Sequence, residues 1–343
     1  MAQTDPVRPG PTNSLVDVPG LQVGHAQLPG EGALSGTTVV LPGPDGVVAG
    51  VDVRGGGPGT RETDALDPRT LVERVHAVVL TGGSAYGLAA ASGVADALGA
   101  AGRGFPVGRA PDEVVPVVPA AVVFDLGRGG RFAARPGAAL GAEALAACTD
   151  TAPAEGVVGA GTGTLIGGLK GGVGAASAVL SDGTVVAALV VANAAGSAVD
   201  PATGELWGAR HRHVDDVELP ALPDDRSSLL AALQAAAAPP TLNTTIGVVA
   251  TDAGLSVAQC AKLAAVGHDG LARAVRPVHG MTDGDTFFGL ATTARPAPDL
   301  AALQEILTAG ADCVTRAVVH AVLAARSVET PAGHWRAYRD LVG

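Results

Sequence analysis

The chain has 343 residues, of which 47% are hydrophobic and 16% are charged, and its formal net charge is −11. The apolar fraction excludes an intrinsically disordered chain, and the acidic balance makes nucleic acid a poor partner. Its three cysteines form no CxxC pair, which argues against both a disulfide framework and a structural zinc site. We recognise neither a signal peptide nor a membrane span, so the cytoplasm is the expected location.

The first half of the sequence predicts short strands separated by glycine and proline. Residues 1–13 are rich in these two residues and are expected to form a disordered leader. The apolar runs that follow predict strands, and they are SLVDV, LQVGHA, TTVVLP, GVVAGVDV and HAVVL. A helix is expected after the TGGSAYG turn, because apolar residues recur at helical spacing from Leu88 to Leu98. Another strand is expected from about Ala121.

The second half predicts close-packed strands and longer helices. Residues 156–199 are rich in glycine and alanine, which favours strands joined by tight turns. A helix is expected over 225–238 and ends at the Pro-Pro pair that follows. The segments TTIGVVATDA and GDTFFGLATTA predict strands. Two more helices are expected, one that a capping box begins at Ser256 and a long one from about Asp299.

Strands and helices therefore occur in clumps rather than in strict βα alternation. Such clumping favours a layered α+β fold over a doubly wound sheet. The length allows one large domain or two smaller ones. We see no linker between two cores and expect residues 1–343 to form one domain.

Two motifs suggest ligands but favour structural roles. The segment GTLIGGLK, residues 163–170, misses a Walker A loop by one residue, because Leu169 stands where the phosphate-binding lysine must be. The cluster HRHVDD, residues 211–216, could hold a metal, but its polar surroundings favour a solvated loop. We expect no nucleotide site and no metal or organic cofactor.

The segment Leu242-Asn243-Thr244-Thr245 allows two interpretations. Threonine favours strands, so the segment can simply begin a strand. Alternatively, the hydroxyl of Thr244 attacks the carbonyl of Asn243, an ester forms, and water releases a new N-terminal threonine. That residue would carry a nucleophile together with a base, its own α-amine, whose pKa is ordinarily near 8.

Three other places supply groups that such a reaction could use. Asp283 and Asp285 flank a glycine before a strand, although an ordinary Asp-Gly turn has the same pattern. Asn193 lies between apolar stretches, where a buried amide can donate to an oxyanion. Lys170 lies in a glycine-rich segment almost free of charge, where its pKa would fall or it would pair with a carboxylate.

These residues belong to motifs through which the chain resembles the self-cleaving L-aminopeptidase/D-Ala-esterase family, which includes β-aminopeptidases and nylon-oligomer hydrolases. The resemblance covers nearly the whole chain, and its motifs occur in the correct order. They are LVDVPGLQVGHA, VDVRGGGPGTRETD, LTGGSAYGL, GAGTGTLIGGLKGG, VVANAAG, LNTTIGVVATDA and HGMTDGDTFF.

The resemblance implies a four-layer αββα sandwich of the N-terminal-nucleophile type. It also implies cleavage into residues 1–243 and 244–343, and a homo-oligomer of the cleaved units. By position, Thr244 matches the nucleophile, Asn193 the oxyanion amide and Tyr86 an assisting tyrosine. Lys170 and the Asp283/Asp285 pair match residues around the new N-terminus in the nylon-hydrolase branch, whereas the aminopeptidase branch often has serine as nucleophile.

The expected function is therefore that of a Thr244 amide hydrolase that acts on peptides, amino acid amides or ω-amino acid oligomers through an acyl-enzyme. The expected partners are such a small substrate and further copies of the chain. Two alternatives stay open: acyl transfer from the same acyl-enzyme to an amine, and an uncleaved protein that only binds a small ligand. The sequence does not distinguish L-, D- and β-amino acid substrates.

Overall fold

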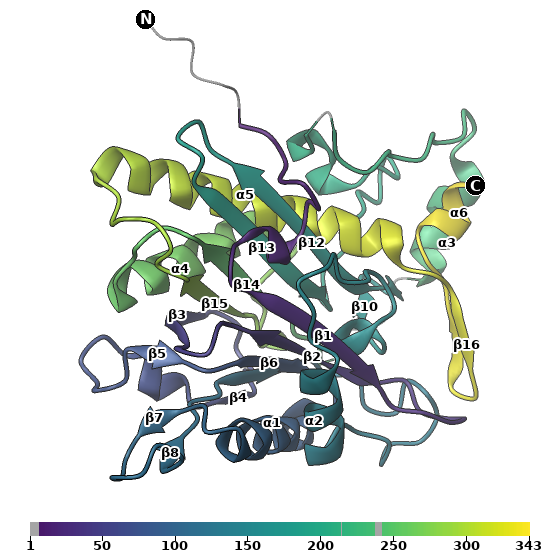
Figure 1. Cartoon of the computed structure of the whole chain (residues 1–343). Coiled ribbons are helices and arrows are strands. Elements are labelled where there is room, and N and C mark those ends of the chain that lie inside the picture. Colours follow the sequence, from purple (N-terminus) through teal and green to yellow (C-terminus); the bar gives the residue numbers. More distant parts are fainter. Residues whose placement is uncertain (1–6, 214, 237–241) are drawn as a thin grey trace, which may run out of the picture.

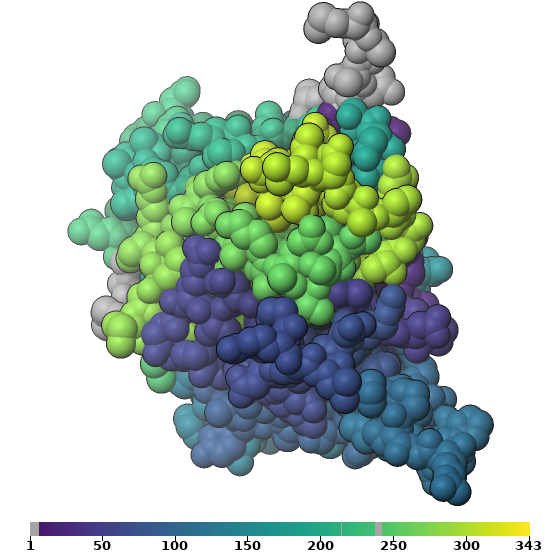
Figure 2. All heavy atoms as spheres, turned by 90° about the vertical axis from the view of Figure 1, so that its left-hand side faces the viewer, coloured from purple at the N-terminus to yellow at the C-terminus, as the bar shows by residue number. Residues whose placement is uncertain are grey.

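The computed structural model describes residues 7–213, 215–236 and 242–343. At its centre two β-sheets lie face to face, and helices cover the outer face of each sheet (Figure 1). In the space-filling view, blue residues from early in the chain form the lower part, and green to yellow residues from its last third form much of the upper part (Figure 2). The arrangement is the expected four-layer αββα sandwich.

The first sheet is built from the early part of the chain. Within the described residues its strand order is β1-β2-β6-β9-β4, and only the β6–β9 pair is parallel. The strands are β1 (Gln22–Gln27), β2 (Gly36–Leu41), β4 (Thr60–Arg61), β6 (Val78–Thr81) and β9 (Ala120–Val122). Four of the apolar runs, LQVGHA, TTVVLP, GVVAGVDV and HAVVL, do form strands, but GVVAGVDV joins the other sheet.

The second sheet carries the segments that matter for the site. Its order among the described residues is β12-β13-β14-β15-β3-β5, and only β14 and β15 run parallel. The strands are β3 (Val47–Val53), β5 (Arg74–Val75), β12 (Gly172–Val179), β13 (Val185–Ala192), β14 (Ile246–Thr251) and β15 (Thr286–Ala291). Every residue of β14 is buried, because the strand has the first sheet on one face and helices on the other.

Helices α1 and α2 pack on the first sheet, whereas α4 and α5 pack on the second. The helices are α1 (Ala89–Ala100), α2 (Ala138–Ala146), α3 (Ser227–Ala236), α4 (Val257–Ala274), α5 (Leu300–Ala324) and α6 (Arg339–Val342). Helix α5 has the length and apolar character of a membrane-crossing helix, but 89% of its most apolar window is buried inside the structure. It is therefore placed as a core helix.

Glycine lets helix and sheet approach closely in the glycine-rich middle of the chain. A Cβ atom on Gly174 of β12 would collide with the backbone of Ala317 and Ala321 on α5.

The chain also forms shorter elements. The two-stranded hairpins are β7 (Phe105–Pro106) with β8 (Val114–Val115), β10 (Leu165–Ile166) with β11 (Leu169–Lys170), and β16 (Val328–Thr330) with β17 (Gly333–Trp335). The 3₁₀ turns are η1 (Leu15–Asp17), η2 (Thr63–Leu66), η3 (Ser84–Leu88), η4 (Gly159–Gly161) and η5 (Trp207–His211).

Some expectations about elements were wrong. The run SLVDV forms the 3₁₀ turn η1 instead of a strand, because the Asp17 carboxylate accepts hydrogen bonds from the backbone N–H groups of Thr12 and Ser14. Helix α2 was not predicted, since its alanine-rich sequence has no clear polar face. The Pro-Pro end expected for helix 225–238 lies outside the described residues.

The expected disordered leader is also wrong for residues 7–13, while residues 1–6 lie outside the described part. The backbone of Arg8 pairs with Val179 at the end of β12. The side chain of Asn13 accepts hydrogen bonds from Ser177 N and Arg316 and donates one to Asp216. Asp216 in turn forms a buried ion pair with Arg316 of α5, so the HRHVDD cluster ends in the interior and not in a fully solvated loop.

Glu155 lies near this ion pair, and its shifted pKa predicts that the free energy of unfolding depends on pH. Burial raises the pKa of Glu155 from 4.5 to about 7, against the opposing hydrogen bond from Ala175 N. Because the pKa of Glu155 is higher in the folded than in the unfolded chain, protonated Glu155 contributes to the free energy of unfolding. This contribution is fully present below the unfolded-state pKa and is lost as pH rises through about 7.

Glu155→Gln keeps the acceptor for Ala175 N and cannot ionise. We expect this variant to unfold at a higher temperature than the wild type at about pH 8 and at nearly the same temperature at about pH 4. Thermal unfolding followed by circular dichroism measures the difference. A difference that is equal at both pH values would contradict the assignment.

Candidate active site

Thr244 lies in the short segment that leads into β14, and its side chain is buried. Its hydroxyl Oγ1 donates a hydrogen bond to the carbonyl oxygen of Asn243. Its backbone N–H donates to the carbonyl oxygen of Asn193 at 2.8 Å. The hydroxyl therefore lies beside the carbonyl group of the peptide bond that joins Asn243 to Thr244.

Asn193 follows directly after β13, the antiparallel neighbour of β14, and this pairing brings it next to Thr244. The side chain is fully buried. Its amide Nδ2 donates to the carbonyl oxygens of Thr244 and Phe124, both at 3.3 Å. Its Oδ1 accepts from Leu165 N at 3.0 Å. The buried amide thus presents its donor side toward Thr244.

The Asp283-Gly284-Asp285 turn brackets the segment on its other side. Asn243 N donates to the carbonyl oxygen of Thr282 at 3.0 Å, and Thr245 N donates to Asp285 Oδ1 at 2.8 Å. Thr286 N closes the bracket by donating to the carbonyl oxygen of Thr245. Three hydrogen bonds therefore fix the backbone immediately before and after Thr244.

Glycine is required at the centre of this turn because Gly284 lies against the hydroxyl. A Cβ atom there would come within 2.8 Å of Thr244 Oγ1 and within 2.5 Å of the carbonyl oxygen of Gly57. The RGGGPG loop packs on the same turn, since Gly57 N donates to the carbonyl oxygen of Asp283 at 2.7 Å. The two motifs, more than 200 residues apart, form one tightly packed corner.

Asp283 and Asp285 are both buried, at 3% and 1% exposure. Burial raises the pKa of Asp283, and the neighbouring charge of Asp285 adds to the effect. Asp283 accepts from Ala195 N and Gly280 N, whereas Asp285 accepts from Thr245 N and from His279 Nδ1 at 2.8 Å. The pair thus reaches Thr244 through its neighbour Thr245.

Lys170 is fully buried, and it forms no ion pair with a carboxylate of residues 7–213, 215–236 or 242–343. Its ammonium Nζ donates to the carbonyl oxygens of Gly161, Thr164 and Gly171, at 2.9–3.0 Å. These acceptors use all three of its N–H groups. Burial lowers its pKa, and the nearby charge of Arg128 adds to this. The expected direct role at the new N-terminus is therefore not visible in its hydrogen bonds.

Arg128 and Asp125 are members of the site that sequence reasoning missed. Arg128 is 7% exposed, and its guanidinium donates to Asn193 Oδ1 at 2.6 Å. Burial lowers its pKa to about 10, while Asp125 acts in the opposite direction. Asp125 itself is buried and accepts from Gly83 N at 2.7 Å. Both residues lie in an irregular loop, FDLGRGGR, whose composition gives no sign that Arg128 is buried.

His279 was also missed, although it precedes the acidic pair in the HGMTDGD motif. Its ring contacts that of His268, with the ring centroids 4.8 Å apart. His268 Nε2 lies 3.0 Å from the carbonyl oxygen of Asp52. His268 and His279 therefore link β3 to Asp285 and the backbone of Thr245 through hydrogen bonds on either side and a ring contact between them.

Tyr86, which matches an assisting tyrosine near the nucleophile, has a largely exposed side chain. The side chain is 55% exposed, and Arg135 stacks on its ring at 3.7 Å. It belongs to η3, whose neighbouring residues Ser84 and Ala85 line the pocket at Thr244. The structure therefore places Tyr86 at the rim of the site. Among the described residues, Tyr86 and Thr244 form no hydrogen bond with each other.

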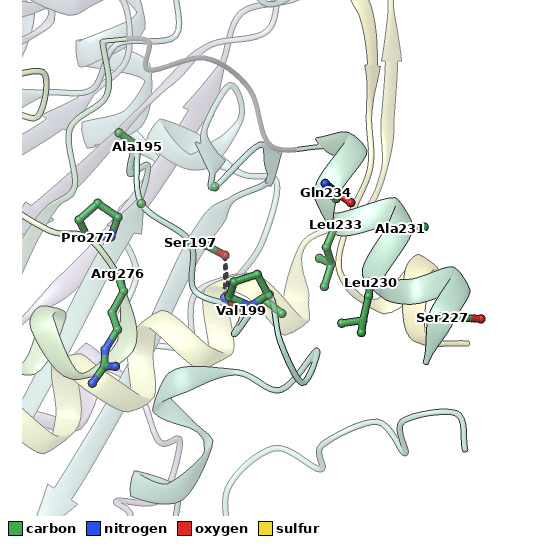
Figure 3. A pocket seen from close by; sticks show the side chains of 13 residues that line it. Ala195, Ser197, Val199, Ser227, Leu230, Ala231, Leu233, Gln234, Arg276 and Pro277 are labelled. Carbon is green, nitrogen blue, oxygen red and sulfur yellow. Dashed lines mark hydrogen bonds between the residues drawn. The ribbon is translucent and has the colours of Figure 1, made fainter. Parts of the chain in front are cut away.

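Two cavities lie in this region. A small one of about 90 Å³ opens at Thr244 between the RGGGPG loop, η3 and β9. A larger one of about 690 Å³ lies between α3 and the segments 195–201 and 276–277. Leu230 and Leu233 point into it from α3 (Figure 3). Ala195, two residues after Asn193, lines the larger cavity, and its N–H donates to Asp283, so this cavity is beside the acidic pair.

No group of three or more His, Cys, Asp or Glu side chains in residues 7–213, 215–236 and 242–343 is arranged to hold a metal ion. The geometry is instead that of a buried hydroxyl, a buried amide donor and a buried acidic pair. Such a set serves acyl transfer to a hydroxyl nucleophile.

Comparison with known proteins agrees with this chemistry. The profile of Peptidase family S58 matches residues 13–336. The chain belongs to peptidase family S58. An uncharacterized aminopeptidase of Mycobacterium tuberculosis is 47% identical, over 96% of this chain and 98% of its own length. A 6-aminohexanoate-oligomer endohydrolase of Kocuria sp. is 30% identical, over 80% of this chain and 74% of its own length.

Solved structures show the same fold for this S58 peptidase. A β-aminopeptidase of Burkholderia sp. superposes with a TM-score of 0.74 at 25% identity, covering 99% of this chain and 97% of its own. The L-aminopeptidase D-Ala-esterase/amidase of Ochrobactrum anthropi, described as a variant of the Ntn hydrolase fold, gives 0.69 at 24% identity, with 97% and 93% covered. The expected family and fold are therefore confirmed, and family membership supports an aminopeptidase or amidase function.

Proposed function

We propose that this S58 peptidase is an autoprocessing N-terminal-nucleophile hydrolase whose nucleophile is Thr244. The observation that carries the proposal is the hydrogen bond from Thr244 Oγ1 to the carbonyl oxygen of Asn243, because it holds the hydroxyl beside the carbonyl it would attack. The buried amide of Asn193 supports the proposal, as do the three hydrogen bonds between the Asn243–Thr245 segment and the Thr282–Thr286 turn, because they fix the position of both residues.

In the first reaction the chain would cleave itself. Thr244 Oγ1 forms a bond to the carbonyl carbon of Asn243, the C–N bond breaks, and the hydroxyl proton passes to the nitrogen of Thr244. Water then hydrolyses the resulting ester and leaves a carboxylate on Asn243 and a free α-amine on Thr244. The products are fragments of 243 and 100 residues.

In the second reaction the same oxygen would attack a substrate amide. The α-amine of Thr244 takes the hydroxyl proton and gives it to the leaving amine as the substrate C–N bond breaks. The acyl group stays on Thr244 Oγ1 as an ester, and water then hydrolyses this acyl-enzyme and releases the acid. Asn193 Nδ2 stabilises the oxyanion, a contribution worth about 3–4 kcal/mol for a donor of this kind. Asp285 keeps Thr245 and therefore the nucleophile in position, and Lys170 holds the Gly161–Gly171 segment behind Asn193.

The substrates we propose are peptides, amino acid amides and ω-amino acid oligomers, in line with the activities named for the relatives. The test is incubation of purified protein with amino acid amides and 6-aminohexanoate oligomers, and with their N-acetylated forms, followed by mass spectrometry of the products. Release of amine and acid supports the proposal. The acidic pair of Asp283 and Asp285 favours substrates with a free amino end, so faster cleavage of the N-acetylated forms would overturn this preference.

Acyl transfer remains the alternative that uses the same intermediate. Adding a simple amine acceptor to the reaction distinguishes the two outcomes, because a hydrolase still forms mainly the acid, whereas a transferase forms mainly the new amide. A chain that stays uncleaved and inactive would instead support a binding protein. Homo-oligomeric assembly and a cytoplasmic location stay predictions.

Gly284 offers a test of the packing around the hydroxyl. Gly284→Ala would push a methyl group against Thr244 Oγ1 and the carbonyl of Gly57. We expect self-cleavage to slow by about 100-fold, since misplacement by about 1 Å can cost that much. Gel electrophoresis over time measures the rate.

Gly57→Ala is the matched control for this variant. A Cβ on Gly57 would make only ordinary contacts, at 3.7 Å, with the same loop pair. It should cleave at close to the wild-type rate. Equal rates for Gly284→Ala and the wild type would show that the hydroxyl does not need its observed position.

A further inference from the structure

The guanidinium of Arg128 connects the oxyanion amide to the residue on the acyl side of the proposed cleavage. One terminal nitrogen donates to Gly163 O at 2.9 Å and to Asn193 Oδ1 at 2.6 Å. The other donates to the side-chain Oδ1 of Asn243 at 2.8 Å. All three partners are buried, so the cation makes these bonds away from bulk water.

The bond to Asn193 fixes the direction of the catalytic amide. Asn193 Oδ1 accepts hydrogen bonds from the Arg128 guanidinium and from Leu165 N. The amide cannot turn over without placing its NH₂ group against these donors, so Nδ2 must face Thr244. A charged donor on Oδ1 also polarises the amide, which strengthens Nδ2 as a donor.

The hydrogen bond from Arg128 to the side chain of Asn243 indicates which acyl residues the site binds. In self-cleavage the attacked carbonyl belongs to Asn243, so its side chain occupies the position that the acyl residue of a substrate would take in turnover. The acceptor there is a carbonyl oxygen on the γ-carbon of that residue. When Asn243 leaves as the new C-terminus, a buried charged donor is left facing the vacated position.

We propose that Arg128 is a specificity and positioning residue that, among peptide and amino acid amide substrates, favours acyl residues with a carbonyl oxygen on the γ-carbon, namely the asparagine and aspartate type. The proposal rests on the proposed function of Thr244. Arg128 makes this selection twice, once on Asn243 during self-cleavage and once on the substrate. A residue of similar size without the acceptor leaves the second terminal nitrogen of the guanidinium without the partner that Asn243 gives it, and such a residue binds less well.

The first test varies Asn243 in the full chain. Asn243→Asp keeps the acceptor, whereas Asn243→Leu has nearly the same shape without it. We expect Asn243→Asp to cleave within about 10-fold of the wild type and Asn243→Leu to be slower by about 10- to 100-fold, the range for a hydrogen bond to a charged group. Leucine that cleaves as fast as asparagine would overturn the proposal.

The second test measures selectivity on substrates. The ratio of kcat/KM for N-terminal asparagine over leucine p-nitroanilide should be about 10 or more in the mature wild type and should approach one in Arg128→Met. Arg128→Lys keeps the charge but loses the fork that reaches two acceptors, so an intermediate ratio is expected. A wild-type ratio near one contradicts the proposal even if Arg128→Met does not fold.

The outcomes separate this inference from the proposed function. A wild type that neither cleaves itself nor hydrolyses any anilide refutes the Thr244 mechanism itself. A wild type that cleaves itself and hydrolyses leucine and asparagine anilides equally well leaves that mechanism standing and refutes only the role of Arg128.

Discussion

Replacing Thr244 by alanine is expected to leave a single full-length chain and to reduce amide hydrolysis by on the order of 10⁶-fold, the loss found when a hydroxyl nucleophile is removed. The variant loses Oγ1 and its hydrogen bond to Asn243 O, but keeps the backbone bond to Asn193 O and the bracket around it. The fold should therefore persist. Denaturing electrophoresis and an amide-hydrolysis assay measure the two losses.

Thr244→Ser is the matched control, because it retains the hydroxyl and removes only a methyl group. It should still yield two fragments and still hydrolyse amides. Substantial hydrolysis by the purified alanine variant would show that another group is the nucleophile. Cleavage of the alanine variant at the same bond would point instead to a contaminating protease.

The second large effect is expected at Asn193. Asn193→Asp keeps an oxygen for Arg128 and Leu165 N but replaces the Nδ2 donor that faces Thr244. We expect kcat to fall by about 10²- to 10³-fold, the usual loss for one oxyanion donor. KM should change little, since the donor acts mainly on the transition state.

Steady-state kinetics on the folded fraction checks this prediction, with thermal unfolding as the control for structure. The aspartate oxygen would face the carbonyl oxygens of Thr244 and Phe124, so some loss of stability is expected as well. An unchanged kcat in a folded and cleaved Asn193→Asp protein would remove Asn193 from the oxyanion site.

Much of the fold was predictable because its core strands are apolar throughout. Strands such as TTVVL and IGVVAT are buried on both faces, and their β-branched runs mark them clearly. Helix α4 begins at the capping box of Ser256 and Gln259, as the sequence predicted. Helix α2 and η1 were missed, because neither apolar periodicity nor propensity separates them from a loop or a strand.

Sequence motifs predicted some residues of the candidate site. Residues that reach the site only through long-range packing could not be predicted. The positions of Thr244, Asn193 and the acidic pair follow from motifs in the family's order. Arg128 has no such signal, because its burial depends on loops that meet only in the folded chain. Lys170 was expected to have a lowered pKa or to pair with a carboxylate. Burial lowers its pKa, and carbonyl oxygens of its own glycine-rich segment accept its hydrogen bonds.

Denaturing mass spectrometry of the purified wild-type protein, taken together with its amide-hydrolysing activity over time, tests self-cleavage at Thr244 directly. We expect two masses, for residues 1–243 and for 244–343 with a free N-terminal threonine, and activity that rises as they accumulate. A protein that hydrolyses amides at full rate while the bond between Asn243 and Thr244 stays intact would show that self-cleavage does not create the active site.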